Sequence, residues 1–198
     1  MASEVRLPKP SPRGNLRRRP NWEPLPKRKF AIALAAMLSE LRFTAPASRV
    51  ERNMTAGTDT KRIAVIGAGG VGGSFGAALA KVGNDVTFVA RGAHLAAMRA
   101  RGLSVLGPRG DIHLNPVQAT DDPTSTGPVD YVMFCVKLWD VESAGAAVRP
   151  LVGPTTAIIP LQNGIDASER LIPILGKDAV MGGVAQISAT VAEPGVIR

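Results

Sequence analysis

A short apolar run that leads directly into three regularly spaced glycines constrains this chain more than any other feature. Residues 63–66 (Ile-Ala-Val-Ile) are mostly β-branched, a composition that predicts a strand buried on both faces. Gly67, Gly69 and Gly72 follow in the pattern G-x-G-x-x-G, and apolar residues then recur at helical spacing until Gly83. The glycines therefore lie between a strand and a helix, the context in which this pattern predicts dinucleotide binding.

Each glycine of this loop has its own physical function in a dinucleotide site. Gly67 allows the tight turn out of the strand, Gly69 lets the backbone approach a pyrophosphate, and Gly72 lets the helix pack closely on the strand. The N–H groups of the first helical turn, together with the helix dipole, would bind the phosphates. The alternative is a glycine-rich turn that binds nothing. We predict a cofactor site formed by Gly67, Ala68, Gly69, Gly70, Val71 and Gly72.

Arg91 directly follows the second predicted strand, residues 85–90, and no acidic residue stands beside it. Enzymes that use NAD usually place Asp or Glu at this point, where the carboxylate holds the ribose 2′-hydroxyl. A guanidinium instead fits a 2′-phosphate, and a hydrogen bond to a charged group contributes about 1.5–3 kcal/mol. We therefore predict NADP(H) as the cofactor; the alternative is an exposed arginine that opens the next helix.

Basic residues are concentrated in the first third of the chain. Residues 1–60 contain 12 Lys and Arg against 5 Asp and Glu, whereas residues 61–198 contain 12 against 11, so most of the net charge of +8 lies before residue 61. Prolines and basic runs dominate residues 1–29, a composition that cannot bury a core. We predict a disordered basic extension over residues 1–60 and one domain over residues 61–198, with no nucleic-acid binding expected for that domain.

Three further interpretations of the N-terminal third stay open. The apolar run 30–38 follows a basic cluster and resembles the core of a signal peptide, although the segment before it is long and proline-rich. Met54 fits a true start, because the first strand begins soon after it, and residues 1–53 would then be an upstream extension without a folded function. The third is a basic segment that contacts nucleic acid or anionic lipid.

A single cysteine and the absence of a long apolar run bear on the location of the protein. Cys135 is the only cysteine, so an intrachain disulfide cannot form, as expected in a reducing cytoplasm. No segment reaches the roughly 18 apolar residues that a membrane-spanning helix requires. We therefore expect a cytoplasmic protein that does not span a membrane.

Strand and helix patterns alternate from Lys61 onward. Helices are predicted from Arg91 to near Gly102 and at residues 141–148 and 169–175, the last capped by Asp166 or Ser168. Further strands are predicted at residues 103–106, 129–136, 155–161 and within 179–188, with an antiparallel edge at 111–117 and a polar loop over 121–128. This alternation predicts a Rossmann-type α/β fold, a doubly wound and mostly parallel sheet with helices on both faces.

Lys137 and Asn163 each come directly after a predicted buried strand. The carboxyl ends of such strands form the ligand crevice of open α/β sheets. A cation at that edge can meet an anion, and an amide can both donate to and accept from a carboxamide or a 2-oxo acid. The alternatives are a surface lysine and an asparagine that only forms a turn before Gly164.

The remaining reactive side chains are weaker candidates. Cys135 lies inside an apolar strand, which predicts a packed thiol and not a nucleophile. His94 and His113 have no acid or cysteine at ligand spacing, so we predict that both are surface or edge residues and that there is no metal site.

Residues 61–198 resemble the N-terminal half of a ketopantoate reductase (2-dehydropantoate 2-reductase). The resemblance rests on the loop 66–73, on Arg91, on Val136-Lys137 with Trp139, and on residues 161–164 (Leu-Gln-Asn-Gly). It implies an NADPH-dependent reduction of 2-dehydropantoate to pantoate, a step of pantothenate biosynthesis. In that family the Arg91 position holds the 2′-phosphate, the Lys137 position contacts the cofactor, and the Asn163 position contacts cofactor and substrate.

The family pattern continues with a second, helical domain that supplies a catalytic lysine, the general acid for the forming alkoxide. The sequence ends at Arg198, before that domain, so the catalytic residue is not assigned and Lys137 is the one donor worth testing. Four interpretations follow: a ketopantoate reductase, whole or truncated; a reductase of a different 2-oxo acid; a non-catalytic NADPH-binding fragment; and a basic-tail interaction protein. The expected partner is a small-molecule 2-oxo acid, and a homodimer stays open.

Overall fold

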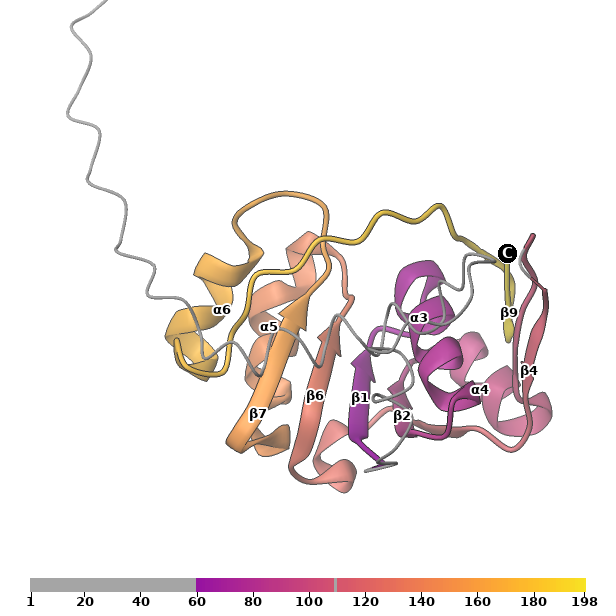
Figure 1. Ribbon diagram of the computed structural model, residues 1–198, viewed down its shortest axis with the longest axis horizontal. Helices are drawn as coiled ribbons and strands as arrows, with labels where there is room; N and C mark the ends of the chain where they lie inside the picture. Colours follow the sequence, from indigo (N-terminus) through magenta and orange to yellow (C-terminus); the bar gives the residue numbers. More distant parts are fainter. Residues whose placement is uncertain (1–59, 109) are drawn as a thin grey trace, which may run out of the picture.

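The computed structural model describes residues 60–108 and 110–198 (Figure 1). The predicted disorder of the basic extension, the signal-like run 30–38 and the alternative start at Met54 all lie outside the described residues. Within the described part of the chain, no helix is long and apolar enough to cross a membrane.

The main sheet has five strands, and every neighbouring pair runs parallel. Its order across the sheet is β5 (Gln118–Thr120), β2 (Asp85–Val89), β1 (Arg62–Ile66), β6 (Val129–Phe134) and β7 (Val152–Pro160). The strand order reverses between β1 and β6, the switch point at which doubly wound sheets bind their ligands. The predicted Rossmann-type fold is therefore confirmed.

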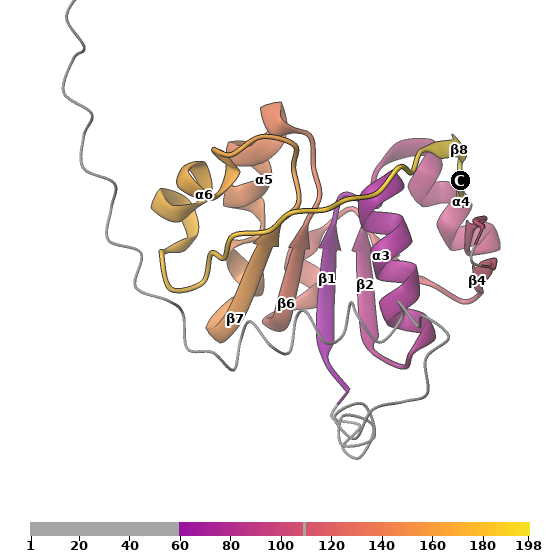
Figure 2. The same cartoon turned by 45° about the horizontal axis from the view of Figure 1, so that its top comes forward.

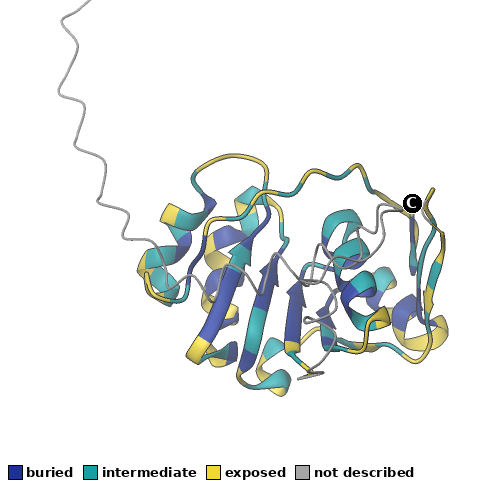
Figure 3. Cartoon of the chain, in the orientation of Figure 1, coloured by how far each residue is buried: buried dark blue, intermediate teal, exposed yellow. Residues whose placement is uncertain are grey.

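Helices cover both faces of this sheet (Figures 1 and 2). On one face, α3 (Gly70–Lys81) and α4 (Gly92–Arg101) share a core with Ile63 and Val65 of β1. On the other face, α5 (Val141–Ala147) and α6 (Ala167–Leu175) share a core with Ala64 and Ile66. The side chains of β1 after Arg62 thus alternate between two cores, which is why Ile63, Ala64, Val65 and Ile66 are apolar and buried (Figure 3).

Three short 3-10 turns complete the connections between these elements. They are η1 (Pro123–Thr126), η2 (Leu138–Asp140) and η3 (Arg149–Leu151). The predicted polar loop 121–128 contains η1, where the Asp122 carboxylate accepts a hydrogen bond from the Thr124 N–H. The short edge strand β5 just before it was not predicted, because Gln118–Thr120 has no apolar pattern.

A second, four-stranded sheet lies beside α3 and α4. Its order is β4 (Ile112–Leu114), β3 (Leu103–Val105), β9 (Val196–Ile197) and β8 (Val191–Glu193). The antiparallel return of β4 along β3 confirms the predicted edge. The strand predicted at 103–106 is present as β3, but it belongs to this small sheet and not to the parallel one. Its two neighbours are β4 and β9, with which it pairs along its two edges.

The prediction of a strand within residues 179–188 is wrong. Only an isolated bridge joins Val180 to Ile158, and no regular structure follows until β8. Residues 182–190, which we call the crossing segment, instead run from the end of β7 to the start of α3 (Figure 2). Two close approaches mark this path: a Cβ on Gly183 would lie 2.4 Å from the Pro160 carbonyl oxygen, and one on Gly70 would lie 2.0 Å from that of Ala189.

Candidate functional site

The carboxyl edge of the parallel sheet gathers the loops that carry the predicted site residues. Backbone hydrogen bonds continue just beyond the strands: the Gly67 N–H donates to the Val89 carbonyl (3.1 Å), and the Leu161 N–H donates to the Phe134 carbonyl (2.9 Å). These bonds keep the ends of neighbouring strands aligned, so the loops leave the sheet at one edge. The predicted residues on these loops are the glycine loop (residues 67–72), Arg91, Lys137 and Asn163.

The three glycines of the glycine loop have distinct surroundings. Gly67 has φ +91°, a backbone conformation that favours glycine. A Cβ on Gly72 would lie 2.2 Å from the Gly67 carbonyl oxygen, so this position needs glycine for the helix to pack on the strand. A Cβ on Gly69 would meet nothing within 4 Å, so the space in front of Gly69 is open. These surroundings match the turn, the close packing and the open approach expected of such a loop.

The first turn of α3 is free of capping side chains. Its N-cap is Gly69, no side-chain hydrogen bond caps it, and no acidic residue lies in its first turn. The first N–H groups of a helix have no partner within the helix, and the helix dipole makes this end positive. This end of α3 is therefore suited to bind an anionic group such as a pyrophosphate.

Arg91 is the N-cap of α4 and is exposed. Its guanidinium has neither a hydrogen-bond nor an ion-pair partner within residues 60–108 and 110–198. The backbone before it is held in place, since the Ala90 N–H donates to the Thr120 carbonyl at 2.9 Å. The side chain thus starts from a fixed point beside the glycine loop and is available to an anion.

Lys137 and Asn163 are both exposed, one after β6 and the other after β7. Lys137 is the N-cap of η2, where its carbonyl accepts a hydrogen bond from the Asp140 N–H at 2.9 Å. The chain bends at residues 163–165, and Gly164 has φ +110°, a backbone conformation that favours glycine. Asn163 therefore lies at the carboxyl edge of the sheet, where its side-chain amide is exposed. Its contact with a ligand stays a prediction.

Gln162 joins the two loops that carry Lys137 and Asn163. Its side-chain Nε2 donates to the carbonyls of Phe134 (2.9 Å) and Val136 (3.2 Å). This positioning function was missed, because the acceptors are backbone carbonyls that no sequence pattern identifies. The available signal was its place in the stretch 161–164 (Leu-Gln-Asn-Gly), on which the resemblance partly rests.

Cys135 and His113 behave as predicted. Burial raises the pKa of the Cys135 thiol to about 12, so it stays protonated and is a poor nucleophile near neutral pH. His113 is exposed on β4, where its Nδ1 lies 3.0 Å from the Ser104 hydroxyl. Among the described residues, no group of three or more His, Cys, Asp or Glu side chains is placed to hold a metal ion.

The prediction for His94 is wrong, because this side chain is half-buried and bonded at both ring nitrogens. Its Nε2 lies 2.9 Å from the Ala68 carbonyl oxygen, and the Gly195 N–H donates to its Nδ1 at 3.1 Å. The sequence carried no signal for the Gly195 contact, since the two residues are joined only by the tertiary fold. His94 therefore contacts the glycine loop directly.

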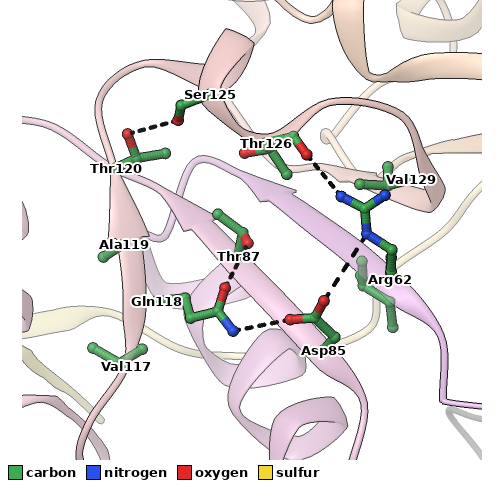
Figure 4. Close-up of a pocket in the computed structure, with 11 residues that line it drawn as sticks. Arg62, Asp85, Thr87, Val117, Gln118, Ala119, Thr120, Ser125, Thr126 and Val129 are labelled. Carbon is green, nitrogen blue, oxygen red and sulfur yellow. Dashed lines mark hydrogen bonds and ion pairs between the residues drawn. The ribbon is translucent and has the colours of Figure 1, made fainter.

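A polar cavity of about 470 Å³ lies at the opposite edge of the sheet (Figure 4). It opens beside Arg62 and Asp85, the first residues of β1 and β2. Its polar groups bind one another: Arg62 donates to the Thr126 carbonyl (2.7 Å), and Gln118 donates to Asp85 (2.9 Å). The cavity is thus separate from the glycine loop, and its two charged side chains, Arg62 and Asp85, already have partners within the protein.

Comparison with known proteins agrees with this arrangement. A family model described as ketopantoate reductase PanE/ApbA matches residues 63–198. The 2-dehydropantoate 2-reductase of Mesorhizobium japonicum is 31% identical, over 69% of this chain and 48% of its own length. The crystal structure of 2-dehydropantoate 2-reductase from Porphyromonas gingivalis W83 aligns with a TM-score of 0.64 and 42% identity, over 70% of this chain and 51% of that one.

A more distant structure shares the fold alone. D-mandelate dehydrogenase, solved with NADH and anilino(oxo)acetate, aligns with a TM-score of 0.64 and 21% identity, over 69% of this chain and 44% of that one. The chain spans about half the length of the relatives that it matches. Because the family model matches residues 63–198, which is more than half of the sequence and includes the glycine loop, the chain belongs to the ketopantoate reductase PanE/ApbA family.

Proposed function

We propose that this chain binds NADP(H) at the carboxyl edge of its parallel sheet and serves the reduction of 2-dehydropantoate to pantoate, a step of pantothenate biosynthesis. The observation that carries the proposal is the glycine loop, in which Gly69 faces open space and the first turn of α3 lacks a capping side chain. A pyrophosphate would accept hydrogen bonds from the N–H groups there. The family and the names of its relatives support the reaction.

The choice of NADP(H) over NAD(H) rests on Arg91. The exposed guanidinium follows β2, the place where a carboxylate would select the ribose 2′-hydroxyl. Within the described residues it has no protein partner, so it is available to a 2′-phosphate. The related fold of D-mandelate dehydrogenase was solved with NADH, so both cofactors belong in the test.

Lys137 and Asn163 would line the reacting end of the site. When bound, the cofactor would supply the hydride. Lys137 would hold an anionic group of the cofactor, and the Asn163 amide would contact both cofactor and substrate, since it can donate to the carbonyl oxygen of a 2-oxo acid. The new alkoxide needs a proton, and we assign no catalytic donor to it; Lys137 is the candidate to test.

A second candidate function is NADPH binding without turnover, and a third is reduction of a different 2-oxo acid. The observation that favours them is the share of the relatives that this chain covers, 48% of the Mesorhizobium enzyme and 51% of the Porphyromonas enzyme. The remaining half of those proteins is where further substrate contacts and a proton donor would come from.

The test combines an NADPH titration with NADPH oxidation followed by absorbance, using the purified chain and 2-dehydropantoate. Turnover would support the reductase, and other 2-oxo acids in parallel assays would rank its substrates. Binding without turnover would support the cofactor-binding function alone. If neither NADPH nor NADH bound, the proposed function would be wrong.

We also propose a cytoplasmic location, with a homodimer as the assembly to test, and a dinucleotide-binding domain that needs no residue before 54. Deletion of residues 1–53 should leave the Kd for NADPH unchanged, because the hydrogen bonds that the structure describes at Gly67 and at Ala90, just before Arg91, are made to Val89 and Thr120 of the same domain. A titration of both chains checks this, and sedimentation of each reports the assembly. A large loss of affinity on deletion would contradict the proposed domain boundary.

A further inference from the structure

His94 bridges two parts of the backbone that are far apart in the sequence. The ring lies between the Ala68 carbonyl of the glycine loop, 2.9 Å from Nε2, and the Gly195 amide, 3.1 Å from Nδ1. His94 itself stands in the first turn of α4. One side chain therefore ties the glycine loop to the turn between β8 and β9.

The two contacts require a single tautomer of the imidazole. A backbone N–H can only donate, so the Gly195 amide needs an unprotonated Nδ1 as its acceptor. In the neutral ring the proton then lies on Nε2, which donates to the Ala68 carbonyl. The backbone at Gly195 thus selects the tautomer that binds the glycine loop.

The Ala68 carbonyl belongs to the same peptide unit as the Gly69 N–H. A trans peptide is planar, so its C=O and N–H point in opposite directions. When His94 holds the Ala68 carbonyl, it therefore also sets the direction of the Gly69 N–H. That N–H lies at the N-cap of α3, and a Cβ on the same residue would meet nothing within 4 Å.

The turn that holds His94 is itself firmly placed. The Gly195 carbonyl accepts from the Ser104 N–H at 2.9 Å, and the Arg101 guanidinium donates to the Pro194 carbonyl at 3.2 Å. Gly195 has φ +86° and is buried, and a Cβ there would lie 3.2 Å from the Ala97 Cβ. The Gly195 amide is therefore a fixed point for the imidazole.

The same C-terminal strands also pack on the start of α3. The side chain of Ile197 in β9 fills the space beside Gly73, where a Cβ would lie 2.0 Å from its Cδ1. Ile197 is fully buried. The β8–β9 hairpin and His94 thus reach the glycine loop and its helix from one side, while the open space in front of Gly69 is left clear.

We propose that His94 is a positioning residue of the cofactor site, which holds the Ala68–Gly69 peptide so that the Gly69 N–H points at the pyrophosphate. The inference rests on the proposed NADP(H) binding. His94 does not itself touch the reacting atoms. The neutral tautomer with the proton on Nε2, which the Gly195 amide selects, is the form that donates to the Ala68 carbonyl and holds this peptide.

Three substitutions separate the two contacts. In His94→Gln, the side-chain amide N–H lies near the former position of Nε2, so the hydrogen bond to the Ala68 carbonyl is kept. In His94→Asn, the amide oxygen lies near the former position of Nδ1, so the hydrogen bond from the Gly195 N–H is kept. Ala loses both. His94→Ala and His94→Asn should weaken NADPH binding by about tenfold, and His94→Gln should stay within about threefold of the unaltered chain. His113→Gln, the other histidine and exposed on β4, should bind NADPH like the unaltered chain.

The experiment is a set of NADPH titrations, with thermal unfolding of each variant and ¹⁵N NMR of the His94 ring in the unaltered chain without cofactor. Recovery of affinity in His94→Gln but not in His94→Asn, with an Nε2-protonated ring, is the expected result. Equal affinity in all variants, recovery by Asn alone, or an Nδ1-protonated ring would overturn the inference. If the unaltered chain bound no NADPH, the proposed function would be wrong, but the inference about His94 could still be tested. Hydrogen exchange of the Gly69 amide should then be faster in His94→Ala than in His94→Gln, and equal exchange rates would show that His94 does not hold the glycine loop.

Discussion

The two edges of the parallel sheet use polar side chains in opposite ways. At the amino edge, around the cavity of about 470 Å³, Arg62, Asp85 and Gln118 bind one another and the neighbouring backbone (Figure 4). At the carboxyl edge, Arg91 and Asn163 are exposed and have no side-chain partner within the described residues. The candidate site is therefore marked by exposed polar groups without a side-chain partner, around the uncapped start of α3, and not by this cavity.

This difference follows from the direction of the strands. Parallel strands bring the loops after β1, β2, β6 and β7 to one edge, together with the positive end of α3. At the other edge the chain enters the strands, and Arg62 holds the loop before β6 through the carbonyls of Thr126 and Pro128. Hydrogen bonds there stabilise the fold, so we expect substitutions at the two edges to affect different properties.

The largest effect is expected at Gly72. In Gly72→Ala the new Cβ would lie 2.2 Å from the Gly67 carbonyl oxygen, so α3 or the loop must move. We expect a loss of about 1–3 kcal/mol in the free energy of unfolding, typical of overpacking, together with loss of NADPH binding. Urea denaturation and an NADPH titration measure the two effects.

Gly69→Ala is the matched control within the same loop. Its Cβ would meet nothing within 4 Å, so stability should stay close to that of the unaltered chain while NADPH binding weakens, because the methyl group occupies the open approach. Full NADPH affinity in Gly69→Ala would contradict the placement of the pyrophosphate at this point.

The next effect is expected at Arg91. Arg91→Ala should weaken NADPH binding about ten- to a hundredfold and change NADH binding little, because only NADPH carries the 2′-phosphate. Titrations with both cofactors check this, with unfolding curves to show that the exposed side chain leaves stability unchanged. Equal losses for the two cofactors would end the proposed selection of the 2′-phosphate.

A smaller effect is expected at the amino edge. Arg62→Ala removes hydrogen bonds to the Thr126 and Pro128 carbonyls, both at 2.7 Å, but the side chain is 51% exposed. We expect a loss below about 1 kcal/mol in the free energy of unfolding and no change in the Kd for NADPH. If Arg62→Ala instead weakened NADPH binding as much as Arg91→Ala, the two edges would not be functionally distinct.

The smallest effect is expected at the ion pair between α5 and α6. Arg170 binds Glu142 through two contacts of 2.6 Å, and this hydrogen bonding lowers the pKa of the Glu142 carboxyl below its ordinary value of 4.5. A lowered folded-state pKa means that the stabilisation is present above about pH 4.5 and is lost as the pH falls through the folded value. The stability difference between the unaltered chain and Glu142→Gln should therefore shrink on acidification, while NADPH affinity at neutral pH stays the same. Thermal unfolding at several pH values measures it, and a difference that grew toward low pH would contradict this sign.

Local sequence patterns determined the elements that carry the site. The β-branched run before Gly67, the glycine spacing and the helical repeat up to Gly83 are short-range signals, because strand burial, positive φ and helix periodicity each depend on residues a few positions apart. The same reasoning located Arg91 after β2 and Lys137 after β6. The alternation of strands and helices then determined that these loops share one edge.

Only the tertiary structure decided which backbone groups the polar side chains reach. His94 binds Ala68 and Gly195, and Gln162 binds Phe134 and Val136, through carbonyl and amide groups that every residue possesses. Such partners leave no mark in the sequence, because a backbone acceptor does not depend on residue type. For the same reason the pairing of β3 with β9, and the path of the crossing segment toward α3, came from long-range contacts and not from local pattern.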